Sequence, residues 1–440
     1  MMPGVSREGN LRKVRIFITE AEIKQKNNRT ARILQEIFML LSGMEYVSLS
    51  LERNIPRGTK DSEFEAKMSI TSDMVEEKIK EEAESGQRSN YVVLAHAPMI
   101  FMKLQNVFGV LMEQIMVSLA INLPYADIVH SKKSGGAFIY TYDKRFIIKN
   151  QSETEFKYFL SLLKPYYQHV RDNKDSLLAR ILGMYEITYH GKTSYWVVMA
   201  NVCYGQQILH SRYDLKATSD RTSSEMERRQ AVQVLKDRDF QDEGLRLAHA
   251  GGKVVQQLKN DIKWLVKHRI QGYRLIVGVY VERTMESQRK LFEESGHHGH
   301  YGLLNNQEVW ALNEDDFQNN SVLRKQRALI YKMSLRLQQK LMQESENLRG
   351  SKSSGMADST LRESTIFHGI PSTPVERKGR MRKRVVYVGI IDIMREYNTK
   401  RKLENFWRRT ILWEGDQHSA IAPKSYGERM IRFVSQHLKW

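Results

Sequence analysis

The stretch from Ser134 to Lys149 holds the residues whose types and spacing are best suited to chemistry. Its first residues are small, and they let backbone N–H groups approach an anion because no Cβ blocks the way. After a turn at Asp143-Lys144, a short apolar run delivers Lys149 to the end of a second strand. This pattern is typical of a nucleotide-phosphate clamp, although an ordinary hairpin shares it. The candidate phosphate-binding residues are Ser134, Gly135, Gly136 and Lys149.

A second candidate is Asp392, which directly follows the apolar strand Val385–Ile391. A carboxylate at the end of a buried strand has to be paired or coordinated, so the pattern favours a metal-binding role over a structural one. Glu155 begins a predicted helix and is placed either to pair with Lys149 or simply to lie on the surface.

Two further stretches end predicted strands. The segment Met199–Val202 is a candidate hinge that contacts an adenine through its backbone, with Met199 and Asn201 as the residues concerned. The segment Arg212–Ser219, RYDLKATS, places Asp214 beside Lys216. An acid and a base two residues apart indicate little in isolation.

Composition limits the classes of partner. The chain has 440 residues, of which 41% are hydrophobic, and a formal charge of +18, so it buries a large core and favours a polyanion such as nucleic acid or an anionic membrane. The single cysteine, Cys203, excludes internal disulfides. No run of about 18 apolar residues predicts a membrane span.

The elements that position these residues follow from hydrophobic spacing. Strands are expected at Val14–Thr19 and Tyr46–Leu51, on either side of an amphipathic helix. The charged stretch Thr222–Gln241 is interpreted as a solvent helix or an ordered loop, and Arg349–Arg384 as a flexible linker. The predicted helices that bear on the site are Glu20–Leu41, Phe101–Leu123, Glu153–Leu163 (ended by Pro165) and Val254–Val266.

The tract at 400–409, KRKLENFWRR, combines cationic and aromatic residues. Cations hold anionic headgroups while aromatic rings enter the interface, so the tract suits a membrane surface. The candidate membrane residues are Lys400, Arg401, Lys402 and Trp407.

Taken together, several blocks of the chain resemble the phosphatidylinositol phosphate kinase family in both order and spacing. They cover roughly Tyr91 to the C-terminus, and the type I phosphatidylinositol-4-phosphate 5-kinases are the members most alike. The blocks are HAPMIFMKLQNVFG, SGGAFIYTYDKRFIIK, LLKPYYQHV, VVMANV, RYDLKATSD, VVYVGIIDIM and SAIAPKSYGERMIRF.

The resemblance implies a role for each matching position. Lys149 falls on the family's ATP-phosphate lysine and Asp392 on its metal-binding aspartate, so the two are expected to lie close together. Glu155 falls on the helix glutamate. Asp214 and Lys216 fall on the DLKGS motif, in which alanine and threonine replace Gly-Ser here.

One departure concerns the family's catalytic loop, IMDYSLL, which here reads IQGYRLI. Gly272 takes the place of the aspartate that accepts the proton of the lipid hydroxyl, and glycine has no group that accepts a proton. His268 lies close in sequence. Arg274 replaces the family's serine and adds a cation that could hold a phosphate, which fits binding as well as catalysis.

The resemblance implies an α+β, two-lobed lipid-kinase fold, with an antiparallel sheet in the N-terminal lobe, a smaller mixed C-terminal lobe and an ATP cleft between them. Residues 1–90 are expected to form an N-terminal extension, and residues 91–440 a catalytic domain with insertions near 284–322 and 343–384. The implied cofactors are ATP and Mg²⁺.

Two functions stay open. One is transfer of the ATP γ-phosphate to the 5-hydroxyl of phosphatidylinositol 4-phosphate; the other is a pseudokinase that binds phosphoinositides as a scaffold, because of Gly272. In the family a glutamate twelve positions beyond the metal-binding aspartate marks the 4-phosphate class, and Glu404 stands there, although a solvated helix pairing Glu404 with Lys400 is the alternative. The expected location is cytoplasmic, peripheral on the plasma membrane or endomembranes, with a homodimer left open and no nucleic-acid partner.

Overall fold

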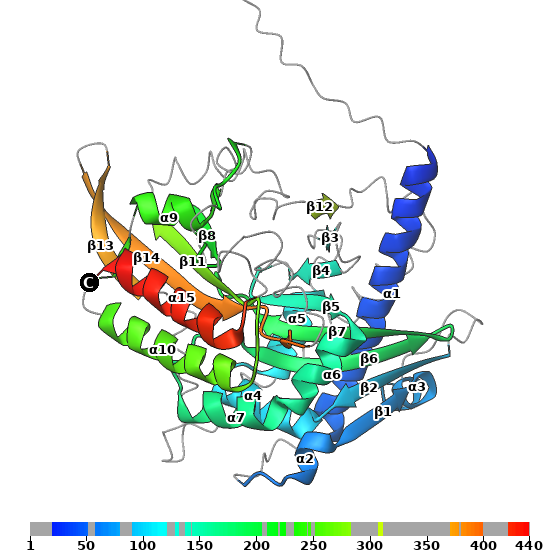
Figure 1. Cartoon of the computed structure of the whole chain (residues 1–440). Helices are drawn as coiled ribbons and strands as arrows, with labels where there is room; N and C mark the ends of the chain where they lie inside the picture. Colours follow the sequence, from blue (N-terminus) through cyan, green and yellow to red (C-terminus); the bar gives the residue numbers. More distant parts are fainter. Residues whose placement is uncertain are drawn as a thin grey trace, which may run out of the picture.

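Two sheets, each built from strands that are distant in sequence, form the framework of the protein (Figure 1). The structure is a computed structural model, and every structural statement below concerns the residues it describes. These are residues 20–51, 58–79, 90–120, 128–131, 137–141, 143–204, 209–218, 221–225, 233–243, 245–247, 251–282, 307–310, 370–377, 380–398 and 421–439. The architecture is α+β, as the sequence predicted.

The larger sheet has eight strands in the described residues, and every neighbouring pair is antiparallel. Lys149 lies on one of its inner strands. In spatial order the strands are β1 (Lys67–Thr71), β2 (Tyr91–His96), β6 (Ile181–Tyr189), β7 (Lys192–Ala200), β5 (Phe146–Gln151), β4 (Ala137–Tyr140), β3 (Ile128–Ser131) and β12 (Gln307–Trp310).

Helices cover both faces of this sheet. Successive side chains on a strand point to opposite sides, so neighbouring residues of one strand contact different helices. On β7, the Trp196 indole N–H donates to Glu36 of α1 at 2.9 Å, whereas the ring of the adjacent Tyr195 packs on Phe156 of α6. The helices around this sheet are α1 (Glu20–Ser50), α2 (Ser62–Glu65), α3 (Ser72–Ile79), α4 (Pro98–Val107), α5 (Met112–Ala120), α6 (Glu153–Ser161) and α7 (Leu163–Asp172).

The predicted strand Tyr46–Leu51 is wrong, because α1 continues through it to Ser50. The buried residues of α1 recur at helical spacing as far as Val47, so the strand-like end of this segment completes one apolar stripe. This stripe comprises Ile33, Leu34, Ile37, Leu40, Leu41, Met44 and Val47. The predicted strand Val14–Thr19 lies outside the described residues.

Two predicted helices are divided differently in the structure. The expected helix Phe101–Leu123 breaks after Val107, where Gly109 adopts φ of +67° and separates α4 from α5. Pro165 does not end the helix that begins at Glu153; it lies in the first turn of α7, where its missing N–H costs no helical hydrogen bond.

The smaller sheet is mixed, since β8 and β9 pair in parallel and the other neighbours are antiparallel. Helices α10 and α15 lie side by side next to it (Figure 1). Its strands, in spatial order, are β13 (Ile370–Arg377), β14 (Arg380–Ile391), β11 (Arg274–Val281), β8 (Ser211–Leu215) and β9 (Gln233–Leu235). The associated elements are α9 (Asp237–Glu243), α10 (Gly251–Lys267), α15 (Pro423–His437) and the short pair β10 (Leu245–Arg246) and β15 (Leu438–Lys439).

The predicted linker Arg349–Arg384 is wrong over its last part, because β13 and the start of β14 form an antiparallel pair there. Gly, Ser and Pro residues made this stretch look like a linker, but Pro371, Ser372 and Pro374 lie within β13. Within the described residues, no single helix is long and apolar enough to cross a bilayer, and α4 with α5 meets that test only as a pair bent by 91°. The arrangement of two lobes around an ATP cleft stays a prediction.

Candidate active site

Lys149 and Asp392 form an ion pair between the larger and the smaller sheet. The Lys149 ammonium on β5 donates to Oδ1 of Asp392 at 3.1 Å, although 243 residues separate them. Strand β5 is held between β4 and β7, which fixes the direction of the lysine. The expected proximity of the phosphate lysine and the candidate metal ligand is therefore confirmed.

Asp392 directly follows β14 and has a φ of +61°, a conformation that Asp tolerates better than most residues. Its second oxygen, Oδ2, accepts from Nε of Arg274 at 2.8 Å and lies 2.6 Å from Nη2. The sheet register explains this pairing, because Arg274 opens β11 directly opposite Ile391. The Asp392 carboxylate is thus held between a lysine and an arginine.

Asp214 joins the same group through Arg274. In the register of β11 with β8, Asp214 lies opposite Ile276, two residues from Arg274 and so on the same face. Nη1 of Arg274 donates to Oδ2 of Asp214 at 2.8 Å. One guanidinium therefore bridges the two aspartates that the sequence marked as candidates.

A second layer holds the segment after β8. Arg221 donates to the Asp214 carbonyl at 3.0 Å and to Oδ2 of Asp237 at 2.8 Å. Oδ1 of the fully buried Asp237 accepts the backbone N–H of Lys216 at 2.8 Å. Neither Asp237 nor Arg221 was a candidate in the sequence. Asp237 falls in Thr222–Gln241, which was interpreted as a solvent helix or an ordered loop, and its apolar neighbours Leu235 and Phe240 were the available signal. Arg221 falls between that stretch and the RYDLKATS segment, with no such signal.

The electrostatics follow from burial and these contacts. Burial disfavours ionisation of Asp392, but Arg274 and Lys149 outweigh it and hold the pKa of this carboxyl well below its usual range. In the same way Arg274, Arg221 and Lys216 lower the pKa of the buried Asp214. Burial lowers the pKa of the Lys216 ammonium, and the neighbouring cations Arg221 and Arg274 lower it further.

Gly272 lies on the segment that leads into β11 and has a φ of +75°. This segment is bonded to the residues just after Asp392. The Tyr397 N–H donates to the Arg269 carbonyl at 2.9 Å, Nη2 of Arg269 donates to the Tyr397 carbonyl at 3.1 Å, and the N–H of Gln271 donates to the Arg395 carbonyl at 3.0 Å. Among the described residues, the atom nearest to an ideal Cβ at Gly272 is Cδ of Arg395, at 3.9 Å.

His268, the histidine nearest to Gly272 in sequence, packs elsewhere. Its ring lies over Trp264 with the centroids 4.6 Å apart, and its carbonyl accepts the Tyr158 hydroxyl. Burial lowers the pKa of this imidazole, and Lys267 lowers it further. The structure therefore gives His268 a packing role beside α10.

The expected ion pair between Glu155 and Lys149 is replaced by two other pairs. Glu155 binds Arg395, with Oε1 at 3.0 Å from Nε and 2.9 Å from Nη2, while Lys149 binds Asp392. Glu155 lies in the first turn of α6, capped by Ser152, and Arg395 lies three residues beyond Asp392. Arg395 was not a candidate in the sequence.

The candidate hinge uses its polar groups within the protein. The Asn201 N–H donates to the Arg145 carbonyl, and its side-chain amide donates to the Lys144 carbonyl, both at 2.8 Å. Met199, on β7, lies opposite Ile147 of the neighbouring strand β5. The hinge is thus bonded to the turn before β5 and so to the strand that carries Lys149.

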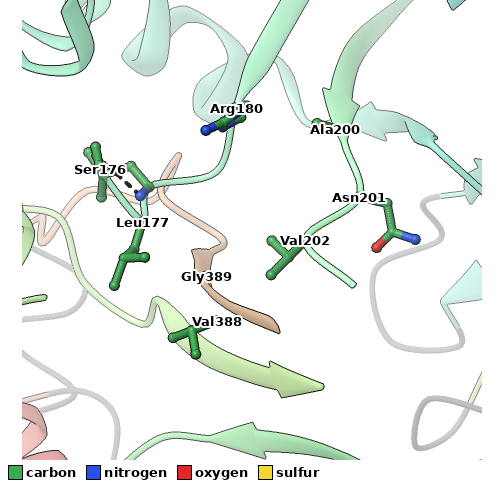
Figure 2. Close-up of a pocket in the computed structure, with 9 residues that line it drawn as sticks. Ser176, Leu177, Arg180, Ala200, Asn201, Val202, Val388 and Gly389 are labelled. Carbon is green, nitrogen blue, oxygen red and sulfur yellow. Dashed lines mark hydrogen bonds between the residues drawn. The ribbon is translucent and has the colours of Figure 1, made fainter. Parts of the chain in front are cut away.

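A shallow pocket with about 310 Å³ of empty space, part of it open solvent, lies beside this hinge. Figure 2 shows Val202 facing it from the hinge, Ser176 and Leu177 from the segment before β6, and Gly389 from β14. Lys149 and Asp392 do not line it. The candidate hinge residue Asn201 lines it.

The remaining predicted site residues lie outside the described residues. They are Ser134, Gly135, Gly136, Lys400, Arg401, Lys402, Glu404 and Trp407. Their roles stay predictions.

The described residues do not fit a divalent cation as they stand. A Mg²⁺ ion takes carboxylate oxygens as ligands, but both oxygens of Asp392 and Oδ2 of Asp214 already contact cationic side chains. No group of three or more His, Cys, Asp or Glu in the described part of the chain is arranged to hold a metal. Magnesium at Asp392 stays a prediction from the sequence.

Comparison with known proteins places the whole arrangement in one family. The family model "Phosphatidylinositol-4-phosphate 5-Kinase" matches residues 122–437. Human phosphatidylinositol 5-phosphate 4-kinase type-2 beta is 26% identical over 366 residues, which cover 80% of this chain and 78% of that protein. Human phosphatidylinositol 4-phosphate 5-kinase type-1 beta is 26% identical over 348 residues, or 78% of this chain and 57% of that protein.

A plant relative, phosphatidylinositol 4-phosphate 5-kinase 5 of Arabidopsis thaliana, is 26% identical over 359 residues, which cover 77% of this chain and 42% of that protein. The chain thus spans about half the length of the 5-kinases it matches. Relatives of both the 4-kinase and the 5-kinase type are similar to it at the same identity. This chain belongs to the phosphatidylinositol phosphate kinase family.

Proposed function

We propose that this chain is a phosphatidylinositol phosphate kinase that transfers the γ-phosphoryl group of ATP to the 5-hydroxyl of phosphatidylinositol 4-phosphate. The observation that carries the proposal is the contact of Lys149 with Asp392, which joins the ATP-phosphate lysine of one sheet to the charged group of the other. The step breaks the bond between the γ-phosphorus and the bridging oxygen to ADP. It forms a bond to the inositol oxygen and releases the hydroxyl proton.

The cations of the site suit this chemistry. The transition state of phosphoryl transfer spreads negative charge over the phosphoryl oxygens, so catalysis rests mainly on positioning and on electrostatic stabilisation. Lys149, Lys216 and Arg274 surround the two aspartates and are assigned to the nucleotide phosphates. Ser134, Gly135 and Gly136 are assigned to the same phosphates from the sequence, and Met199 and Asn201 to the adenine.

The missing base sets the expected rate. A positioned general base contributes about 10²–10⁴ in rate, and Gly272 supplies none. The proton therefore leaves to solvent, and we propose a slow kinase rather than a dead one, because the loose transition state makes limited use of a base.

The substrate assignment rests on Glu404, the residue twelve positions beyond Asp392 in the sequence. In the family this position distinguishes the two lipid classes, and glutamate belongs to the class that uses phosphatidylinositol 4-phosphate. We assign Lys400, Arg401, Lys402 and Trp407 to a membrane at the cytoplasmic face of a cell.

The test is phosphorylation of vesicles that contain either phosphatidylinositol 4-phosphate or phosphatidylinositol 5-phosphate, with labelled ATP. The unmutated protein is expected to prefer the 4-phosphate by at least about tenfold, which corresponds to a difference of about 1.4 kcal/mol. Glu404→Ala is expected to reduce that preference. Equal use of the two isomers by the unmutated protein would refute the substrate assignment.

A second candidate is a pseudokinase that binds phosphoinositides as a scaffold. Two observations favour it: Gly272 lacks a catalytic group, and Arg274 ties together the aspartates that the family uses for catalysis. This candidate requires that no labelled lipid forms at any protein concentration, while binding to phosphoinositide vesicles persists.

A further inference from the structure

We propose that Arg274 is a built-in substitute for the divalent cation of a nucleotide site, so that this chain binds ATP without a metal ion. The proposal rests on nucleotide binding in the proposed function and specifies the cation that this binding uses. It starts from the disagreement described above between the predicted magnesium ligand and the contacts of its oxygens.

Arg274 occupies the place between the two aspartates. Its Nε and Nη2 face Oδ2 of Asp392 at 2.8 and 2.6 Å, and its Nη1 faces Oδ2 of Asp214 at 2.8 Å. Carboxylate oxygens are the ligands that Mg²⁺ uses in nucleotide sites, where the ion then meets the phosphates. The guanidinium takes up one oxygen of each of the two aspartates.

The backbone holds Arg274 in this place. Arg274 opens β11 and lies in register with Ile391, the residue before Asp392, while β8 carries Asp214 on the other side of the same strand. The two carboxylates in turn hold the guanidinium ionised, since they raise its pKa although burial lowers it. A planar guanidinium matches phosphate oxygens with paired hydrogen bonds, so the cation is positioned before a nucleotide arrives.

The charge balance at the site favours an anion over a further cation. Among the described residues, these contacts join four cationic side chains to three carboxylates: Lys149, Lys216, Arg221 and Arg274 to Asp214, Asp237 and Asp392. The cations repel one another at Lys216: burial lowers the pKa of its ammonium, and Arg221 and Arg274 lower it further. A polyphosphate relieves this repulsion, whereas a divalent ion beside Arg274 adds to it.

The same contacts are compatible with another role, in which Arg274 blocks the site until a metal ion displaces it. The two roles differ in one measurable property. A substitute cation makes ATP binding independent of magnesium, whereas a displaceable block makes it depend on magnesium.

The experiment measures the Kd of ATP by titration calorimetry on the full chain, in excess EDTA and again in excess MgCl₂. The wild-type Kd is expected to change by less than about twofold between the two conditions. Arg274→Ser is expected to bind at least about tenfold more weakly than wild type in EDTA, because charge-assisted hydrogen bonds are lost, and to regain affinity in MgCl₂.

Two further variants separate the fork of hydrogen bonds from the charge. Arg274→Lys keeps the charge and loses the fork, so it is expected to fall between wild type and Arg274→Ser in EDTA. Arg171→Ser removes an exposed arginine of α7 that pairs with Asp172, and it is expected to leave the Kd unchanged in both conditions. The wild-type comparison stands even where Arg274→Ser fails to fold.

Binding of ATP by the wild type in MgCl₂ but not in EDTA would overturn the inference and leave the proposed kinase activity standing. Binding of ATP equally in both conditions, without any lipid phosphorylation, would support the inference and refute the proposed activity. Absence of ATP binding in both conditions would overturn both.

Discussion

Gly272 lacks the carboxylate that the family's aspartate supplies at this position. Its φ of +75° is a conformation that Asp and Asn adopt more readily than most residues, and among the described residues the nearest atom to an ideal Cβ is 3.9 Å away. We therefore expect that the family's aspartate can be restored here.

Gly272→Asp is expected to raise lipid phosphorylation by more than about tenfold, because a positioned general base contributes about 10²–10⁴ in rate. The measurement is the initial rate of label transfer from ATP to phosphatidylinositol 4-phosphate vesicles. Gly272→Asn is the matched control, since it has the same shape and backbone preference but accepts no proton. An equal gain in both variants would show that the aspartate does not act as a base.

Ala217 is strained where the family's motif has glycine. Its φ is +57°, and it is buried. A left-handed conformation costs an L-residue about 1–2 kcal/mol, of which the greater chain entropy of glycine in the unfolded state offsets about 0.5–1.

Ala217→Gly is therefore expected to increase the free energy of unfolding by about 0.5–1 kcal/mol, measured by urea denaturation. Ala179→Gly is the control, because Ala179 is equally buried and is not among the positive-φ residues of the described chain. That variant should lose stability. Destabilisation by Ala217→Gly would mean that the methyl group contributes more by packing than it costs in strain.

At the scale of elements, helix α1 is joined to the larger sheet by a buried polar contact. Glu36, which is 6% exposed, accepts from the Trp196 indole at 2.9 Å and from Nε of Arg32 at 2.9 Å. The Trp196 N–H also reaches Ser194 at 3.0 Å. This contact sets the rotation of α1 on the strand next to the one that carries Lys149.

Glu36→Ala is expected to lower the free energy of unfolding by about 1–3 kcal/mol, because it removes a charge-assisted acceptor and leaves a gap in a buried place. Glu36→Gln keeps an oxygen for Trp196 and should lose clearly less. Both values come from urea denaturation of the full chain. Equal losses for the two variants would assign the effect to the charge pair with Arg32 instead.

The elements differ in how well their sequence predicts them. The short apolar runs Phe146–Ile148 and Val385–Ile391 lie within β5 and β14, and each is followed by a charged residue, Lys149 or Asp392. This pattern marked both residues in the sequence, although β5 continues past Lys149 to Gln151. The end of α1 looks like a strand in the sequence because apolar and polar residues alternate from Val47 to Leu51, but its place in an apolar stripe that begins at Ile33 decides the structure. Packing along the whole helix outweighed the local preference for a strand.

At the scale of the whole molecule, the residues of the site come together only through long-range register. The motif blocks marked Asp214, Arg274 and Asp392 separately, but only the pairing of β8, β11 and β14 shows that one guanidinium joins the two carboxylates. The contact of Glu155 with Arg395 likewise depends on how the two sheets meet. No spacing within the sequence contains this information.

The formal charge of +18 suggests electrostatic attachment to a membrane. Replacement of Lys400, Arg401 and Lys402 by glutamine is expected to weaken binding to anionic vesicles by about 100-fold, since each cation near the surface contributes about 1 kcal/mol. The measurement is sedimentation with vesicles at physiological salt.

The matched control replaces Lys253, Lys263 and Lys267, three exposed lysines of α10, by glutamine. It removes the same charge and should change binding much less. Equal weakening by both triple variants would show that net charge, and not the 400–409 tract, attaches the protein.

The short segment Arg269–Gln271 has a consequence for how this family diversifies. It bonds to Tyr397 on one side, and the Gln271 amide donates to the Ile421 carbonyl at 2.9 Å on the other. The described residues on either side of positions 399–420, which include Glu404, are thus bonded to the same tripeptide. Doubling the length of a stretch with fixed ends costs only about 0.6 kcal/mol. We therefore expect that the stretch between these two anchors can be lengthened or exchanged at a small cost in stability, while the anchors keep their bonds.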